Sequence, residues 1–543
     1  MKRKAVAAVL TAVMVASMFT GCGSDKGSSS AKSTSAASAA NDTVDEDGKV
    51  NGIMYQEGLP LVDEGDYTFS IFCDDSSESG EFIMLDEFKK QTNVDVDLKI
   101  YPYETATERL NLDLNSGDYA DVIGGWTLSD NAILTYGVNQ GVFIPLEDYF
   151  EKYCPNISAI LDLPGVREKM TAPDGHIYTI PYVCADTTVG YSPYINTKWL
   201  ENVGMSMPTT TDEFEAVLKA FKEQDANGNG DASDEIPFST DPNNKHIEAM
   251  AGYFGLPMNK LGIAIQDEKV VYGGVSNTYR EFLSWFHKLY ADGLVDVELY
   301  TQDSSTWEGK GNQDLYGVSI AYGSGEFTGI PAAEERGDFD SMPVLNTDKG
   351  GIWLRDTEGF SVYRTQAVIT NKAEHPEIIC RWFDNAFALE NGIGCNRGPV
   401  GVIVNKEDDG YHAIDTTTLS EEDQEKYSWG NLWPQSLPKY LPADFEFVEE
   451  HPMYDEKKAT EEAYEANLTK EIIPSYWIDL DKIDTFSDTN TAIKDFFEQQ
   501  QAQFVCGELD IDNDADWQAY VDGMYSLGLE DWVATQGIEE IAK

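Results

Sequence analysis

Residues 67–126, YTFSIFCDDSSESGEFIMLDEFKKQTNVDVDLKIYPYETATERLNLDLNSGDYADVIGGW, contain the pattern that decides the fold. Apolar residues dominate 67–73, alternate with polar ones over 94–101 and return at 120–126, which predicts three strands. The intervening stretches 82–90 and 105–114 have helical spacing. Strands that alternate with short helices predict βαβ units and a parallel sheet. The sequence therefore indicates an α/β protein.

Polar and aromatic residues follow the first and third predicted strands. In open α/β sheets, ligands bind beyond the carboxyl ends of the strands. A sugar presents hydroxyl groups and apolar C–H faces, so a sugar site needs carboxylates or amides and an aromatic ring. We therefore predict that Asp74, Asp75 and Trp126 line a ligand crevice. Helix capping is the alternative for the two aspartates, and a core position is the alternative for Trp126.

A second α/β block follows the first. It contains strand patterns at 191–195 and 317–322, a helix that begins with the capping box Thr210–Glu213, and an aromatic-rich helix over 279–290. Late in the chain, 361–370 resembles a strand and 376–387 a helix. Beyond the N-terminal segment about 490 residues remain, which is too many for one core and predicts two or more domains.

The N-terminus has the organisation of an export signal. Lys2, Arg3 and Lys4 precede an apolar run over 5–19, which is too short to span a bilayer comfortably. The run ends in FTGC (19–22), which resembles the bacterial lipobox. We predict a signal peptide over 1–21, lipidation of Cys22 and a flexible Ser/Ala/Gly-rich linker over 22–50. An ordinary signal peptide with a chance cysteine is the alternative.

Composition excludes several classes of partner. The chain has 38 basic and 96 acidic residues, a formal net charge of −58, which repels nucleic acid and anionic lipid headgroups. No CxxC motif occurs, so a zinc site is not expected. We expect free thiols at the other six cysteines, with disulfides as the alternative: Cys73, Cys154, Cys184, Cys380, Cys395 and Cys506.

Six segments occur in a recognisable order: 112–126, 174–182, 189–223, 289–296, 316–327 and 361–387. Together they resemble family 1 extracellular solute-binding proteins, the carbohydrate-capturing lipoproteins of ABC transporters. The tail, with Asp516-Trp517 and LGLEDW (527–532), resembles the larger, oligosaccharide-binding members. The similarity runs from about residue 66 to the end.

The resemblance implies a two-lobed, type II periplasmic-binding-protein-like fold with a ligand cleft and a hinge of crossing segments. We assign 66–187 plus 358–405 to one lobe and 188–357 plus 406–543 to the other. The expected partners are an oligosaccharide and permease subunits, and the expected state is a monomer held at the outer face of the cell membrane by its lipid alone. Further residues in cleft-facing segments are Tyr182, Tyr191, Glu326, Trp353, Arg355 and Arg397.

The segment DANGNGDASDE (225–235) predicts a calcium loop. Side-chain oxygens at its first, third and fifth positions and glycine at the sixth are what this cation requires. The EF-hand pattern breaks at the twelfth position, Ile236. A similar shortened loop holds structural calcium in alginate-oligosaccharide-binding relatives, and the corresponding ligands here would be Asp225, Asn227, Asn229, Asp231, Asp234 and Glu235. A polar turn is the alternative.

No catalytic signature is present. The sequence lacks HExxH, the Walker A motif, GxSxG and a GxGxxG after a strand, so we predict a binding protein without enzymatic activity. A glycosidase is the rival, because paired carboxylates beside aromatic rings also serve hydrolysis. A surface adhesin without a transporter is a second alternative.

The lipid anchor gives the first testable prediction. Cys22→Ala removes the only thiol that the lipobox offers to diacylglycerol, so the variant should be released into the medium or remain unprocessed. Detergent phase partitioning of the wild type and the variant measures this. Equal partitioning of both proteins into the detergent phase would contradict the anchor.

Overall fold

The computed structural model describes residues 42–542 apart from 76–80, 242–245, 330–336, 415, 443–444, 446 and 449–451. The predicted signal peptide, Cys22 and linker residues up to 41 lie outside the described residues. Residues 42–50, which we assigned to the linker, are instead packed. Strand β1 (Lys49–Val50) pairs with β2 (Met54–Tyr55), and Val50 is buried in a hydrophobic core. The predicted linker is therefore too long at its C-terminal end.

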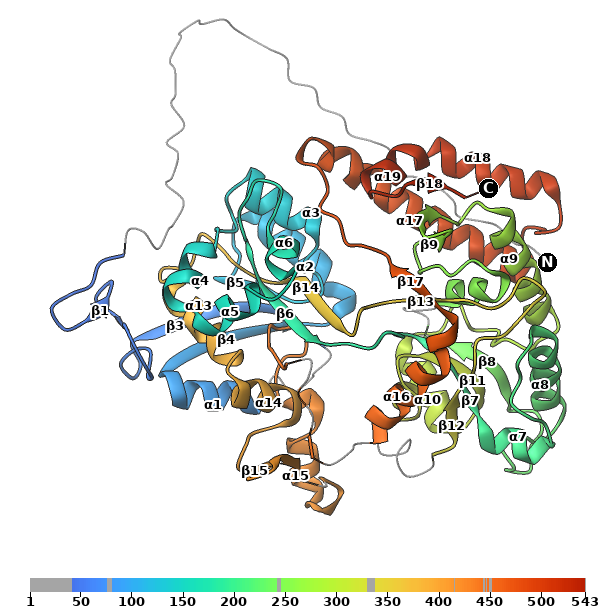
Figure 1. Cartoon of the computed structure of the whole chain (residues 1–543), viewed down its shortest axis with the longest axis horizontal. Coiled ribbons are helices and arrows are strands. Elements are labelled where there is room, and N and C mark those ends of the chain that lie inside the picture. Colours follow the sequence, from blue (N-terminus) through green and yellow to red (C-terminus); the bar gives the residue numbers. More distant parts are fainter. Residues whose placement is uncertain are drawn as a thin grey trace, which may run out of the picture. The chain divides into compact units, whose positions relative to one another are not determined.

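The first sheet confirms the predicted βαβ pattern (Figure 1). Its strand order is β4 (Val94–Tyr101), β3 (Tyr67–Asp74), β5 (Val122–Gly124), β14 (Phe360–Ile369) and β6 (Thr179–Ala185). Strand β3 pairs in parallel with β4 and β5, whereas β14 is antiparallel to β5 and β6. The sheet with its helices is called the first lobe below.

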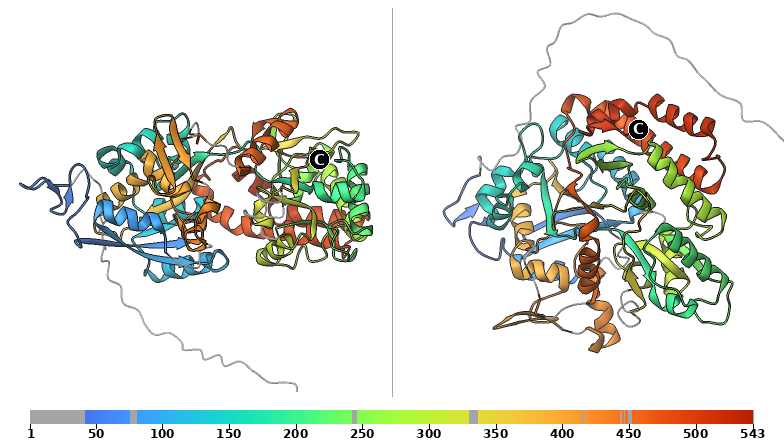
Figure 2. Two further views of the ribbon diagram at one scale, coloured as in Figure 1. Left: turned by 90° about the horizontal axis from the view of Figure 1, so that it is seen from below. Right: turned by 45° about the vertical axis from the view of Figure 1, so that its right-hand side comes forward.

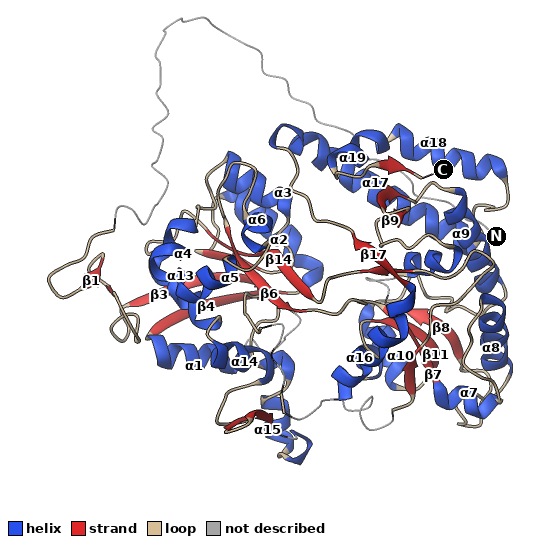
Figure 3. Ribbon diagram, in the orientation of Figure 1, coloured by secondary structure: helices blue, strands red, loops and turns tan. Residues whose placement is uncertain are grey.

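Helices cover both faces of this sheet (Figure 3). Side chains alternate along a strand, so Phe72 faces α2 (Tyr103–Ser116) while Ile71 faces α1 (Ile83–Thr92) and α13 (Pro376–Ala386). Further elements of this part of the chain are α3 (Asp130–Ala132), the π-helix η2 (Ile133–Asn139), α4 (Glu147–Tyr153), α5 (Pro155–Leu161), α6 (Val166–Met170), α14 (Leu389–Arg397), β15 (Val404–Glu407), β16 (Gly410–Ala413), η4 (Thr416–Thr418), α15 (Glu421–Lys426) and η5 (Trp429–Asn431).

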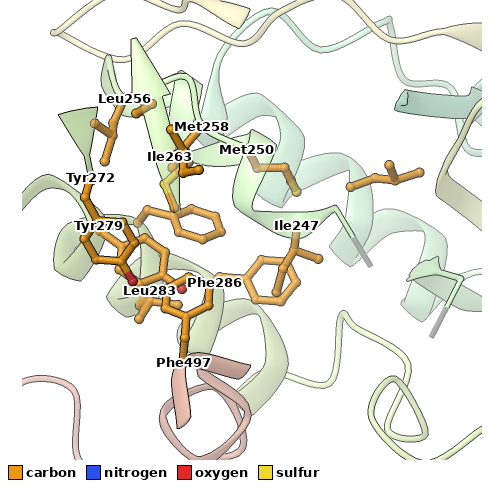
Figure 4. Packing of buried hydrophobic residues seen from close by; sticks show 14 of the residues in the cluster. Ile247, Met250, Leu256, Met258, Ile263, Tyr272, Tyr279, Leu283, Phe286 and Phe497 are labelled. Atoms are coloured by element: carbon orange, nitrogen blue, oxygen red, sulfur yellow. The ribbon is translucent and has the colours of Figure 1, made fainter. Parts of the chain in front are cut away.

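The second lobe is built on a mixed sheet of order β12 (Phe339–Ser341), β7 (Ser192–Asn196), β11 (Tyr316–Ala321) and β8 (Ile236–Thr240). Strands β8 and β11 are parallel. Its core is aromatic, and Tyr279 stacks on Phe497 at a centroid distance of 5.6 Å (Figure 4). Helices of this lobe include α7 (Thr197–Val203), α8 (Thr211–Glu223), η3 (Ile247–Phe254), α9 (Asn277–Ala291), α10 (Ser304–Asn312), α11 (Gly325–Thr328), α16 (Pro452–Tyr464), η6 (Glu465–Asn467) and η7 (Leu480–Lys482).

The C-terminal helices α17 (Ile483–Cys506), α18 (Asp514–Ser526) and α19 (Leu529–Thr535) pack on one another (Figure 2). Two smaller sheets accompany the second lobe: β18 (Glu540–Ile541) with β10 (Lys269–Tyr272) and β9 (Ile263–Gln266), and β13 (Trp353–Arg355) with β17 (Leu468–Ile472). In the described part of the chain, no helix combines the length and apolar character that a membrane span requires.

The lobe boundary at 405/406 is wrong. Residues that we assigned to the second lobe pack on the first: Trp433 and Leu437 belong to the core that contains Trp382, and Tyr440 bridges to Val183 of β6. The reason lies in long-range hydrogen bonds to the end of β3, which are described next. The chain leaves the first sheet after β6 and returns to it at β14.

Candidate ligand-binding site

The carboxylate of Asp74 organises the loop that carries Trp126. Asp74 ends β3, is fully buried and accepts the N–H groups of Trp126 (2.9 Å) and Thr127 (2.6 Å). Burial raises the pKa of Asp74, and these hydrogen bonds act in the opposite direction. Gly125 has φ +132°, and a Cβ there would lie 2.2 Å from Asp74 Oδ1. Asp74, predicted to contact ligand, is thus engaged in supporting the loop.

Asp75 supports a second loop, residues 429–440, which is distant from it in the sequence. It is buried, and its carboxylate accepts the Gln435 N–H at 2.8 Å, while Ser436 Oγ donates to the Asp74 carbonyl. Gln435 Nε2 donates to the Trp429 carbonyl at 2.9 Å. The end of β3 therefore holds residues 429–440 against the first lobe. Asp75, like Asp74, acts on aromatic-bearing loops rather than facing an open surface.

Four aromatic rings, which we call the aromatic row, lie across the end of the first sheet: Trp126, Tyr363, Tyr182 and Trp429. Trp126 meets Tyr363 edge-on at 5.4 Å, and Tyr363 stacks on Tyr182 at 5.6 Å. Trp126 follows β5, whereas Tyr363 and Tyr182 lie on β14 and β6. These three strands are neighbours in the sheet, so the three rings lie in line. Lys439 Nζ lies 5.3 Å from the Tyr182 ring centre and 5.9 Å from that of Trp429.

The two ends of the aromatic row are open to solvent. Trp126 is 45% exposed and Trp429 is 52% exposed, although both are large apolar side chains. Exposed indole faces beside half-buried tyrosines suit stacking of a flat apolar ligand face. Trp126 was predicted for this role from its position after a strand and two glycines. Trp429 and Tyr363 were not predicted, because nothing local marks them as neighbours of Trp126.

The second lobe carries its own aromatic group at the ends of β8 and β11. Tyr191 stacks on His246 at 3.9 Å and lies 6.1 Å from Tyr322. Burial lowers the pKa of His246 to about 3, so the imidazole is neutral. Glu326 accepts the Tyr322 N–H at 2.9 Å and is exposed. The predicted residues Tyr191 and Glu326 thus lie at one end of the second sheet.

Two crossing segments, 186–190 and 356–359, are hydrogen-bonded to each other between the lobes. Asp186 N donates to Gly359 O (3.1 Å), and Gly190 N donates to the Asp356 carboxylate (2.7 Å). The Asp186 carboxylate accepts the hydroxyl groups of Tyr363 (2.9 Å) from the first lobe and Tyr322 (3.5 Å) from the second. Asp186, which sequence reasoning did not identify, therefore joins the two aromatic groups.

Three other predicted residues have different surroundings. Trp353 is 1% exposed and packs between Tyr253 (5.7 Å) and Tyr464 (5.5 Å), so it is a core residue and the prediction for it is wrong. Arg355 donates to Thr469 O (3.1 Å) and lines a cavity of about 350 Å³ together with Asp356. Arg397 is half-buried near Tyr182, and burial lowers its pKa to about 10.

The segment 225–235 folds as a tight polar loop at the start of β8. Gly230 N donates to Asp225 Oδ2 (3.0 Å), Asp231 N donates to Asn229 Oδ1 (2.7 Å), and Asn229 Nδ2 donates to Asp234 Oδ2 (2.7 Å). Ala226 N donates to Glu235 Oε1 (2.8 Å). Two carboxylate oxygens, Asp225 Oδ1 and Glu235 Oε2, are buried without a hydrogen-bond partner. Orphaned carboxylate oxygens are what an oxygen-coordinated cation would satisfy.

Substitution of Asp74 tests its supporting role. In Asp74→Asn the amide group opposes one of the two N–H donors, so the free energy of unfolding should fall by about 1–3 kcal/mol. Urea denaturation measures this. Asp97→Asn, on the exposed face of β4, is the control and should change stability by less than about 0.5 kcal/mol. Equal stabilities for Asp74→Asn and the wild type would contradict the role.

The family model described as bacterial extracellular solute-binding protein matches residues 76–392. The fructooligosaccharide ABC transporter substrate-binding protein FusA of Streptococcus pneumoniae is 33% identical over 335 residues, 60% of this chain. The chain thus spans only 61% of the length of this curated relative.

The similarity to solved structures covers more of the chain than the similarity to this curated relative. An EF-hand mutant of S. pneumoniae FusA in complex with fructo-nystose has a TM-score of 0.74 and 27% identity, covering 86% of this chain and 98% of that one. Alginate-binding protein AlgQ2 without calcium ion has the same fold, with a TM-score of 0.70 and 22% identity over 88% of this chain and 99% of that one. The predicted two-lobed α/β fold and the predicted family are confirmed, and this chain belongs to the bacterial extracellular solute-binding proteins.

Proposed function

We propose that this protein captures a neutral oligosaccharide outside the cytoplasm, as a monomer, and delivers it to the permease subunits of an ABC importer. The observation that carries the proposal is the aromatic row of the first lobe, with Trp126 and Trp429 exposed at its ends. Consecutive sugar rings expose apolar C–H faces that stack on such rings. The similarity to FusA, a fructooligosaccharide-binding protein, supports the same ligand class.

The polar groups around the rings favour a neutral ligand. Asp186, Glu326 and Asp356 supply carboxylate acceptors for sugar hydroxyls, and the chain carries a formal net charge of −58. A field of this sign disfavours an anionic ligand. Fructooligosaccharides such as nystose have hydroxyl groups and no charge, so they fit these acceptors. They are the first ligands to test.

Enzymatic and adhesive roles are alternatives that a direct assay separates. The family and FusA are substrate-binding proteins, which favours capture over hydrolysis. Incubation with nystose should leave the sugar intact, and chromatography of the mixture checks this. A pair of neighbouring permease genes would favour import over adhesion.

The lipid anchor at Cys22 completes the proposal. The first described residues are held on the first lobe, since Tyr153 OH donates to the Asp42 carboxylate at 2.8 Å. Only the residues from 23 to 41 would then separate the lipid from the folded protein. Such a linker keeps the binding protein close to its transporter.

Loss of the Trp126 ring should weaken sugar binding. We expect a wild-type dissociation constant on the order of micromolar for the cognate oligosaccharide, and Trp126→Ala should raise it roughly 5- to 150-fold, because about 1–3 kcal/mol of stacking is lost. Isothermal titration with kestose, nystose and other neutral oligosaccharides measures this. Tyr525→Ala, which removes an exposed ring of α18, is the control and should bind normally. An unchanged affinity in Trp126→Ala removes this residue from the site.

We also propose that the loop 225–235 binds calcium for structural reasons. The buried orphan oxygens of Asp225 and Glu235 support this, with Asn227, Asn229, Asp231 and Asp234 as further ligands. The existence of an EF-hand in FusA supports it independently. The loop precedes β8, whereas the aromatic group of the second lobe follows β8 and β11, so the cation would lie at the opposite end of the sheet from the sugar.

Calcium removal should therefore reduce stability and leave sugar affinity nearly unchanged. A cation that binds only the folded state stabilises it by about 2.7 kcal/mol at a hundredfold excess over its dissociation constant. Chelation should lower the melting temperature of the wild type, and Asp225→Ala should no longer respond to calcium. Asp118→Ala, an exposed carboxylate in the turn after α2, is the matched control and should respond as the wild type does. Identical melting curves with EDTA and with calcium would contradict calcium binding and favour the alternative, a polar turn without a cation.

A further inference from the structure

A buried lysine lies beneath the outer end of the aromatic row. Lys439 is 1% exposed, and its ammonium group donates to Gln435 Oε1 at 2.6 Å. The same Gln435 donates through Nε2 to the Trp429 carbonyl and through its backbone N–H to the buried carboxylate of Asp75. The ammonium group is therefore fixed by the network that also holds the main chain of Trp429.

The ammonium group is within cation–π range of two rings of the site. Its distances to the ring centres of Tyr182 and Trp429 are 5.3 Å and 5.9 Å. Such contacts are strongest when the cation is shielded from water, as Lys439 is. Trp429 lies on the single turn η5, and protein atoms cover only about half of its surface.

We propose that Lys439 is a positioning residue of the sugar site: its ammonium group holds the rings of Tyr182 and Trp429 in the orientation in which an oligosaccharide stacks on them. Lys439 itself does not reach the ligand, because the rings and the protein interior cover it. The inference rests on the proposed function for the identity of the ligand. The link between Lys439 and Trp429 rests on the contacts alone.

Lys439 loses its positive charge at raised pH. Burial lowers its pKa to about 8, so the ammonium group is lost as the pH rises through this value. The groups that act on it are Asp75, Arg397 and the thiols of Cys184 and Cys395. Burial raises the pKa of Cys184 to about 12 and that of Cys395 further, and Arg397 keeps its charge up to a pH of about 10.

A second buried lysine complicates any pH profile of sugar affinity. Lys457 of α16 also has a pKa lowered to about 8 by burial, and it lies 3.9 Å from the ring centre of Tyr322 in the second lobe. It donates to the carbonyls of Gly190 (2.8 Å) and Val189 (3.2 Å). A readout confined to Trp429 is therefore needed.

Fluorine NMR of the full mature chain labelled with fluorotryptophan supplies this readout without any sugar. Trp429→Phe identifies the resonance of Trp429. In the wild type this resonance should shift as the pH is raised through about 8. The shift should persist in Lys457→Met and vanish in Lys439→Met. An unchanged shift in Lys439→Met overturns the proposal.

Lys439→Arg is the second variant, in case the methionine variant fails to fold. Its guanidinium group stays charged over this range, so the Trp429 resonance should stay constant with pH. A titration identical to that of the wild type would overturn the proposal.

Titration with nystose then tests the consequence for binding. Lys439→Met should weaken binding roughly three- to thirtyfold. Because Lys439 acts partly through Trp429, the loss in the double variant Lys439→Met/Trp429→Ala should be smaller than the product of the two single losses. Additive losses would contradict the shared role. If nystose and the other oligosaccharides all fail to bind the wild type, the proposed function fails while the NMR result still decides the link between Lys439 and Trp429.

Discussion

The buried carboxylates at the end of β3 are the constraint on which the candidate site depends. Asp74 accepts two N–H groups from the loop of Trp126, and Asp75 accepts the Gln435 N–H in the segment that carries Trp429. Burying a carboxylate is costly unless hydrogen bonds replace its water. These bonds come from two loops that are far apart in the sequence. The two buried carboxylates at the end of β3 therefore set the positions of the loops that carry the exposed indoles of Trp126 and Trp429.

A carboxylate also connects the two lobes at the candidate site. Asp186 accepts a tyrosine hydroxyl from each lobe, and it lies on one of the two hydrogen-bonded crossing segments. A ligand shifts an equilibrium between open and closed forms only by as much as it binds one form better. Under the proposed function, an oligosaccharide that contacts both aromatic groups would therefore favour the form in which one ligand reaches both.

The fold could be predicted from local patterns, whereas the residues of the candidate site could be predicted only in part. Alternation and helical spacing identified β3, α1, β4, α2 and β5, because each signal is contained in a few consecutive residues. Trp126 was identifiable from the glycines before it. Trp429 and Lys439 were not, since their link to Asp75 spans 360 positions in the sequence. Trp353 was misassigned because an apolar residue at a strand end can face either the core or the cleft, and here it packs on Tyr464.

Each lobe holds a buried lysine against an aromatic ring of the site, in a protein whose net charge is −58. The two ammonium groups have different hydrogen-bond acceptors. Lys457 donates to backbone carbonyls of the crossing segment and is surrounded by Glu326, Asp356 and other carboxylates, whereas Lys439 donates to a side-chain amide. Desolvation of both lysines reduces stability, and rings fixed in advance lose less conformational entropy when a ligand stacks on them. Under the proposed role of Lys439, the folding stability lost by burying its ammonium group is offset by two rings, half-buried Tyr182 and exposed Trp429, that are already oriented for a ligand.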